Sequence, residues 1–144
     1  MEISSKKYEK LVVYTDGGAR GNPGPAAIGL VIYNEKRKLI KKYSKFVGEM
    51  TNNQAEYTAI VYGLKEAKKI GAKEIDFYLD SELLVGQLNR KFKIKNLELG
   101  RVFVKIWNLS QDFKKVNFYY LPREKNKEAD QLVNQTLDKG VDEW

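Results

Sequence analysis

The stretch "TDGGARGNPGPAAIG", Thr15 to Gly29, holds two of the three prolines and five of the eleven glycines of this 144-residue chain. It directly follows "LVVY", residues 11–14, whose β-branched and aromatic side chains predict a strand. Asp16 closes that strand, and an aspartate before two glycines is typical of turn chemistry. The two prolines restrict the turn that follows. The fold prediction is therefore anchored on a strand that ends at an aspartate.

Residues 26–36 and 38–48 predict two further strands, so the chain begins with a meander of three strands. From residue 51 the apolar spacing becomes that of a helix, with Thr51 to Asn53 as N-cap candidates and Gly71 at its end. The remaining elements are expected, in order, as a strand at 73–80, helices at 82–90 and 97–113, a strand at 116–122 and a helix at 126–140. The order βββαβααβα predicts an α/β fold, with a five-stranded mixed sheet and helices on both faces.

Composition narrows the class of protein. Lys and Arg number 26 against 19 Asp and Glu, so the net charge is +7, which favours a polyanionic partner such as nucleic acid. The chain has no cysteine and no histidine, which excludes disulfides and removes the ligands that zinc prefers. No apolar run approaches the roughly 18 residues of a membrane-spanning helix. We expect a cytoplasmic protein with one domain over residues 1–144, of which residues 1–9 form a flexible tail.

Four carboxylates stand at the ends of predicted elements or on an apolar face. Asp16 and Asp80 close two strands, where a turn or an N-cap role is the simpler explanation, although Ser81 is also available to cap the next helix. Glu56 lies on the apolar stripe of its helix, and the alternative is an exposed acid of the first turn. Asp130 falls in the first turn of the last helix, where an acid also compensates the helix dipole.

These four acids converge if the first and fourth strands are parallel neighbours, because the carboxyl ends of such strands meet at one sheet edge. Four acids in one place repel each other strongly unless a cation lies among them. Hard divalent cations such as Mg²⁺ prefer oxygen ligands and commonly engage phosphate. Because the chain has no histidine or cysteine, an all-carboxylate site indicates metal-assisted hydrolysis of a phosphate ester.

Four segments resemble the motif blocks of the ribonuclease H type 1 family, in the family's order and over about Lys10 to Lys139. They are "YTDGGARGNPGPAAIG", "TNNQAEYTAIVYGL", "YLDSELLVGQL" and "PREKNKEADQLVN". The resemblance implies a ribonuclease H fold and endonucleolytic cleavage of the RNA strand of an RNA/DNA hybrid, with 5′-phosphate and 3′-hydroxyl ends. It also implies that two Mg²⁺ ions, which Mn²⁺ can replace, are held by the family's four acids, here Asp16, Glu56, Asp80 and Asp130.

The resemblance also implies contacts with the hybrid. Asn22, Asn52, Asn53 and Gln54 match positions that touch the minor groove, where amide groups detect 2′-hydroxyls, and Thr51 matches a residue that seats a phosphate of the DNA strand. Turn and capping chemistry is the alternative for these polar residues. Further candidate nucleic-acid contacts are Gly17, Gly18, Ser81, Lys91, Lys93 and Arg123.

Two segments depart from the family pattern. Many members carry a histidine in the loop before the last helix; here "LPREKNKEAD" has none, and Glu124 is the nearest acid that could act in its place, or is simply solvated. A long basic protrusion of some relatives is reduced to "NRKFKIKN", which holds Lys91 and Lys93 and predicts weaker, more salt-sensitive binding. Trp107 is expected in the core, on the inward face of its helix.

Three other functions fit the same residues less well. A non-catalytic hybrid-binding module would gain nothing from clustered acids next to phosphates. An enzyme of this fold could also act on double-stranded RNA, which shares A-form features with a hybrid. A detached domain of a larger reverse transcriptase is the third. We expect a monomer with no obligate protein partner and no membrane contact.

Overall fold

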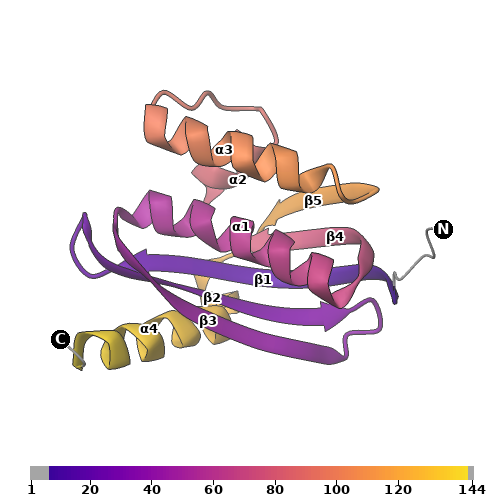
Figure 1. Cartoon of the computed structure of the whole chain (residues 1–144), viewed down its shortest axis with the longest axis horizontal. Helices are drawn as coiled ribbons and strands as arrows, with labels where there is room; N and C mark the ends of the chain where they lie inside the picture. The colour runs from indigo at the N-terminus through magenta and orange to yellow at the C-terminus, as the bar shows by residue number, and fades with distance from the viewer. Residues whose placement is uncertain (1–6, 143–144) are drawn as a thin grey trace.

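The computed structural model describes residues 7–142, and residues 1–6 and 143–144 lie outside the described part. Figure 1 shows a twisted sheet with helices packed against it. The elements are β1 (Tyr8–Ala19), β2 (Gly24–Asn34), β3 (Leu39–Met50), α1 (Asn52–Ile70), β4 (Ala72–Leu79), α2 (Glu82–Leu88), α3 (Leu97–Ser110), β5 (Lys115–Tyr120), η1 (Arg123–Lys125) and α4 (Lys127–Asp142).

The five strands form one mixed sheet in the order β3-β2-β1-β4-β5. β1 pairs with β2, and β2 with β3, in antiparallel fashion, whereas β1, β4 and β5 run parallel. In the parallel pair, Tyr14 lies opposite Tyr78. β4 ends at Leu79, whereas β1 continues to Ala19 because residues 15–19 still pair with β2, so the predicted end of this strand at Asp16 is wrong. The predicted element order and mixed sheet are confirmed, and the crossover through α1 is what makes β4 parallel to β1.

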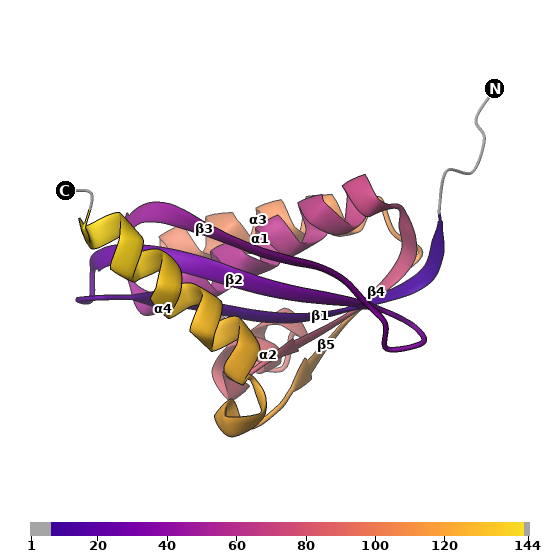
Figure 2. The same ribbon diagram turned by 90° about the horizontal axis from the view of Figure 1, so that it is seen from below.

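Helices cover both faces of the sheet, as predicted. Figures 1 and 2 show α1 and α3 on one face and α4 on the other. The alternation of side chains along β2 explains this arrangement, because neighbouring residues of a strand point to opposite faces. Ile28 belongs to the large core under α1, whereas Ala27 packs with Val133 and Leu137 of α4.

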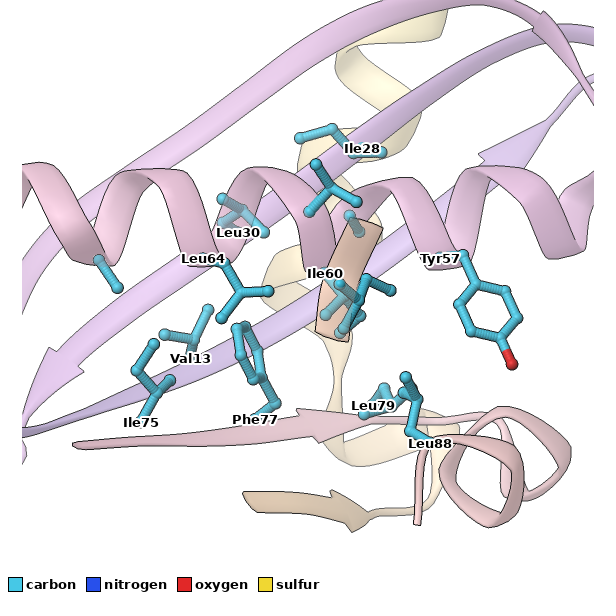
Figure 3. Packing of buried hydrophobic residues seen from close by; sticks show 14 of the residues in the cluster. Val13, Ile28, Leu30, Tyr57, Ile60, Leu64, Ile75, Phe77, Leu79 and Leu88 are labelled. Carbon is cyan, nitrogen blue, oxygen red and sulfur yellow. The ribbon is translucent and has the colours of Figure 1, made fainter. Parts of the chain in front are cut away.

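The main core lies between α1 and the sheet. Ile60 and Leu64 of α1 pack with Val13 and Phe77 of the central strands, and all four side chains are buried (Figure 3). The helix begins at a capping box formed by Thr51 and ends at Gly71, whose φ of 95° favours glycine. Both predicted ends of α1 are confirmed, and the helix is thereby fixed lengthwise over the sheet.

Two sequence-based expectations are corrected. The flexible tail was expected to include residues 1–9, but Tyr8 and Glu9 already belong to β1, because Tyr8 pairs with Ala72 of β4; residues 1–6 lie outside the described part. Trp107 is not a core residue, since its side chain is 48% exposed and stacks under the guanidinium of Arg90, 4.3 Å from the ring centre. α3 packs mainly against α1 rather than against the sheet, so it buries only a narrow face.

No helix within residues 7–142 is both long enough and apolar enough to cross a membrane.

Candidate active site

Three carboxylates meet at the edge of the sheet where β1 and β4 end. Asp16 lies near the end of β1, Asp80 directly follows β4, and Glu56 comes from the second turn of α1. One oxygen from each lies within 4.8 Å of the others. The convergence expected from parallel strands is therefore observed for these three acids.

A close approach between β1 and α1 explains why Glu56 reaches Asp16. Gly17 lies against the backbone of Ala55, and a Cβ atom at Gly17 would overlap the carbonyl oxygen of Ala55. Only glycine leaves room for this contact. The helix start can therefore rest on the strand, with Glu56 facing Asp16 across the contact.

A second glycine brings the fourth acid to the site. Asp16 is paired with Gly29 of β2, and a Cβ atom at Gly29 would lie 2.5 Å from the carbonyl oxygen of Ala129 in α4. The first turn of α4 therefore sits over this pair of strands. Asp130, the next residue of the helix, thereby lies close enough to Asp16 for its negative charge to raise the pKa of Asp16.

Burial and the neighbouring carboxylates raise the pKa values of Asp16 and Glu56. Burial is the largest cause that raises the pKa of Asp16 to about 8, followed by the charges of Asp80 and Asp130, a hydrogen bond with Asp130, and the charge of Glu56. Burial and the charge of Asp80 raise the pKa of Glu56 to about 7, against the lowering effect of Arg123. Negative charge is therefore crowded here beyond what the protein's own cations balance.

The donor set fits a hard divalent cation. Carboxylate oxygens are the ligands that Mg²⁺ and Mn²⁺ take, and a cation among them would relieve the repulsion that raises these pKa values. The acids line an open hollow of about 490 Å³ at the protein surface. Other residues lining it are Gly17, Gly18, Ala19, Arg20, Asn52, Ser81, Arg123, Val133, Asn134 and Leu137.

Asn52 lines the hollow and is hydrogen-bonded to Asn22 of the turn after β1. The backbone N–H of Asn52 donates to Oδ1 of Asn22 over 3.0 Å, and the N–H of Ala19 donates to Oδ1 of Asn52 over 2.8 Å. These bonds fasten the turn after β1 to the start of α1. The side-chain oxygens of Asn22 and Asn52 are thus occupied by backbone N–H groups of the turn and the helix start. Contacts of these two residues with a hybrid stay a prediction.

Capping roles are also observed for other predicted binding residues. The Thr51 hydroxyl accepts from the N–H of Gln54 over 3.1 Å, and Gln54 Nε2 donates to Glu98 Oε2 of α3 over 2.5 Å. Ser81 caps α2 by accepting from the N–H of Leu84 over 3.2 Å. Asn53 is half-buried in the first turn of α1. Their nucleic-acid contacts stay predictions.

The turn before α4 presents Arg123 rather than Glu124 to the acids. Arg123 is 81% exposed at its side chain, and its Nη2 lies 3.9 Å from Oδ1 of Asp130. Glu124 lines a different hollow, of about 930 Å³, on the α4 face of the sheet with Tyr14 and Tyr78. The structure therefore separates Glu124 from the site hollow, and its role as a substitute for the family histidine stays a prediction.

Lys91 and Lys93 also lie outside the hollow. Both are exposed in the segment between α2 and α3, which leads into Glu98 at the α3 start and so to the hydrogen bond with Gln54 in α1. In the view of Figure 1, this segment runs along the top, and α3 lies between it and α1. The contacts of Lys91 and Lys93 with a hybrid stay a prediction.

Three polar residues of the site were not expected from the sequence. Arg20 lines the hollow and forms an ion pair of 2.6 Å with Asp138 of α4. Asn134, one helical turn after Asp130, donates to its Oδ2 over 3.4 Å, and the spacing of four residues could have revealed it. Asn126, which the sequence placed as the first residue of the last helix, lies just before α4 and donates to Asp80.

Comparison with known proteins assigns the class. The family model described as "Reverse transcriptase-like" matches residues 14–136, which is most of the chain. Among solved structures, RNase H1 of the archaeon Halobacterium salinarum superposes with a TM-score of 0.88 at 35% identity, covering 90% of this chain and 98% of that one. The chain therefore belongs to the ribonuclease H type 1 proteins within this family.

Two further relatives extend the comparison. The structure of LC11-RNase H1 in complex with an RNA/DNA hybrid superposes with a TM-score of 0.87 at 42% identity, covering 91% of this chain and 99% of that one. A bifunctional protein of Mycobacterium tuberculosis is 38% identical over 130 residues, covering 90% of this chain. This chain spans only 36% of the length of that relative.

Proposed function

We propose that this protein is an endoribonuclease that hydrolyses the RNA strand of RNA/DNA hybrids and leaves 5′-phosphate and 3′-hydroxyl ends. The observation that carries the proposal is the meeting of Asp16, Glu56 and Asp80 within 4.8 Å, in a hollow that Asp130 also lines. A structural relative is known in complex with an RNA/DNA hybrid, which supports the choice of substrate. A monomer with no obligate protein partner is part of the same proposal.

Asp16, Glu56, Asp80 and Asp130 would hold two Mg²⁺ ions, for which Mn²⁺ could substitute. Bound there, such ions lower the pKa of the attacking water and stabilise negative charge that develops on the phosphate and the leaving 3′ oxygen. The four acids supply only oxygen ligands, and burial together with the neighbouring negative charges disfavours ionisation of Asp16 and Glu56 without a cation. This chemistry needs no histidine for metal binding.

The other residues of the hollow would position the substrate. Gly17 and Gly18 line the hollow, so they would lie next to a nucleic-acid strand bound there. Asn52, already aligned by its bonds to Ala19 and Asn22, keeps its amide nitrogen for contacts at the minor groove. The exposed guanidinium of Arg123 would contact a phosphate and offset the negative charge of the acids.

One cleavage assay tests the proposal. Labelled RNA is presented in a hybrid, in duplex RNA and alone, beside a DNA duplex, each with and without Mg²⁺, to the wild type, Asp16→Asn and Asp80→Asn. We expect Mg²⁺-dependent cleavage of the hybrid by the wild type alone, with 5′-phosphate on the products. Both variants should keep the wild-type circular dichroism spectrum.

Two outcomes would replace the proposal. Binding of the hybrid without cleavage in Mg²⁺ or Mn²⁺ would identify a non-catalytic hybrid-binding module. Equal cleavage of duplex RNA would identify an enzyme that recognises A-form geometry in general. Activity retained by Asp80→Asn would remove Asp80 from the site.

A further inference from the structure

Asn126, between η1 and α4, joins three of the segments that carry the acids. Its Nδ2 donates to the carbonyl oxygen of Thr15 over 2.8 Å and to Oδ2 of Asp80 over 3.1 Å. The backbone carbonyl oxygen of Asn126 accepts from the backbone N–H of Asp130 over 3.2 Å. Because Thr15 directly precedes Asp16, Asn126 is bonded to the Asp80 side chain, to the Asp130 backbone and to the backbone just before Asp16.

The orientation of the Asn126 amide follows from its partners. Both partners of Nδ2, the carbonyl oxygen of Thr15 and the carboxylate of Asp80, are hydrogen-bond acceptors. If the amide were turned over, Oδ1 would face these two oxygens and two bonds would become repulsive contacts. The donor side of Asn126 is therefore committed to the site.

This orientation is unfavourable for the local structure. An asparagine directly before a helix commonly accepts an N–H of the first turn with Oδ1 and so caps the helix. Here Asn126 is 2% exposed, and its buried Oδ1 has no hydrogen-bond partner among residues 7–142. A buried acceptor without a partner costs stability. A residue that breaks the local rule in this way commonly serves the site instead.

We propose that Asn126 is a positioning residue, which holds the Asp80 carboxylate toward Asp16 and Glu56 and fixes the start of α4 relative to the ends of β1 and β4. This inference rests on the proposed function, since it concerns the same metal-binding acids. Without the Nδ2 donor, repulsion from the neighbouring carboxylates would turn Asp80 away from the cluster. Asn126 itself reaches neither the metal nor the substrate and acts through Asp80.

The informative variant is Asn126→Ser. Serine is a good N-cap, so it can supply the helix cap that Asn126 omits, but its side chain is too short to bridge Thr15 and Asp80. The matched control is Asn89→Ser, because Asn89 also donates from Nδ2 to a backbone carbonyl, that of Phe118, over 3.1 Å, yet lies outside the hollow. Each variant loses a side-chain to backbone bond, and only Asn126→Ser loses the contact with an acid.

Three measurements are made on each protein: the melting temperature in metal-free buffer, Mg²⁺ binding by calorimetry, and kcat and KM on the hybrid. For Asn126→Ser we expect a metal-free melting temperature equal to or above that of the wild type. Mg²⁺ affinity and kcat should fall by about 10- to 100-fold, the usual loss when the partner of a metal ligand is removed. KM should stay unchanged, and raised Mg²⁺ should partly restore kcat. Asn89→Ser should keep Mg²⁺ affinity and kcat.

Unchanged Mg²⁺ affinity and kcat in Asn126→Ser would overturn the inference, and so would losses that only follow a lower fraction of folded protein. The calorimetry separates this inference from the proposed function. If the wild type binds Mg²⁺ but cleaves no hybrid, the proposed function fails, while the comparison of Mg²⁺ affinities still decides the role of Asn126. A wild type that binds no Mg²⁺ would overturn both.

Discussion

Asp16 of β1 lies opposite Gly29 of β2, and the absence of a side chain at Gly29 is what allows the first turn of α4 to rest on the strands beside Asp16. The acid and the glycine thus form one structural unit, although thirteen positions separate them in the sequence. Gly17 plays the same part for α1 and Glu56. Glycines of the opening motif therefore assemble the site by permitting close backbone contacts.

Gly29→Ala should impair catalysis more than binding. The added Cβ would lie 2.5 Å from the Ala129 carbonyl oxygen and 3.0 Å from Cβ of Leu132, so α4 must shift and carry Asp130 away from Asp16. We expect a lower kcat, a smaller change in hybrid affinity, and a loss of unfolding free energy of about 1–3 kcal/mol from overpacking. Single-turnover cleavage and denaturant titration measure these quantities.

Gly100→Ala is the control for that variant. Gly100 lies within α3, and an added Cβ atom would have no heavy atom within 4 Å among the described residues. We expect unchanged cleavage and a gain of roughly 0.5–1 kcal/mol in the free energy of unfolding. Equal kcat in Gly29→Ala and the wild type would show that the close contact with α4 is not needed for activity.

The stability of the metal-free protein should depend on pH through Asp16. Its pKa rises from 3.8 to about 8 on folding, so the folded chain keeps a proton that the unfolded chain has lost. The stabilisation of the folded state by this proton on Asp16 is complete below pH 3.8 and disappears as the pH rises through about 8. Asp16→Asn should therefore melt a few degrees above the wild type at pH 9 in EDTA, relative to the difference at pH 4.

Bound Mg²⁺ should remove the loss of folding stability that accompanies ionisation of Asp16. At pH 8, millimolar Mg²⁺ should raise the melting temperature of the wild type but not that of Asp16→Asn, because a bound cation offsets the crowded charges. Glu35→Gln, an exposed change remote from the hollow, should respond to Mg²⁺ like the wild type. The absence of any Mg²⁺-dependent shift in the wild type would count heavily against the carboxylate cluster as a metal site.

Arg123→Ala should reduce activity more than Glu124→Gln. Arg123 lines the hollow that holds the four acids, and it lowers the pKa of Glu56. Glu124 lines the separate hollow that contains Tyr14 and Tyr78. We expect about a tenfold lower kcat/KM for Arg123→Ala, which corresponds to the loss of one charged phosphate contact. Steady-state kinetics on a hybrid provide the measurement. A larger loss in Glu124→Gln would instead support Glu124 as the substitute for the family histidine.

The connector between α2 and α3 should contribute to salt-sensitive binding. If Lys91 and Lys93 contact phosphates, replacing both by alanine should weaken hybrid binding and reduce the slope of log K against log salt by about one per lost contact. Lys36→Ala, at the β2–β3 hairpin near the opposite end of β1, is the matched control. An unchanged slope in the double variant would exclude the connector from the interface.

Much of the fold and the main site could be predicted from particular residues. Thr51, Gly71 and Ser81 mark helix ends by local chemistry, which depends on the nearest few residues and so is legible in the sequence. The change from strand to helical period predicted the element order, and this order allowed Asp16 and Asp80 to meet at one sheet edge if the first and fourth strands are parallel neighbours. The structure confirms that condition, so the candidate acids were readable from the sequence before the strand order was known.

Tertiary packing decided what these local rules leave open. Trp107 matched an inward position by period, yet α3 packs mainly on α1 and leaves the ring against Arg90. In the turn before α4, neighbouring residues compete for the same hollow, and the η1 geometry directs Arg123 to it and Glu124 elsewhere. Spacing gives no orientation in so short and irregular a turn.

Asn126 shows the same division at a single residue. It directly precedes α4, where an asparagine commonly caps the helix with its side-chain oxygen. The structure instead places its donor between Thr15 and Asp80, residues that are 111 and 46 positions away. Only the folded chain brings these two acceptors together, and their hydrogen bonds with Nδ2 fix the amide in an orientation that does not cap the helix. This orientation depends on the assembled strands, so it could not be inferred from the sequence.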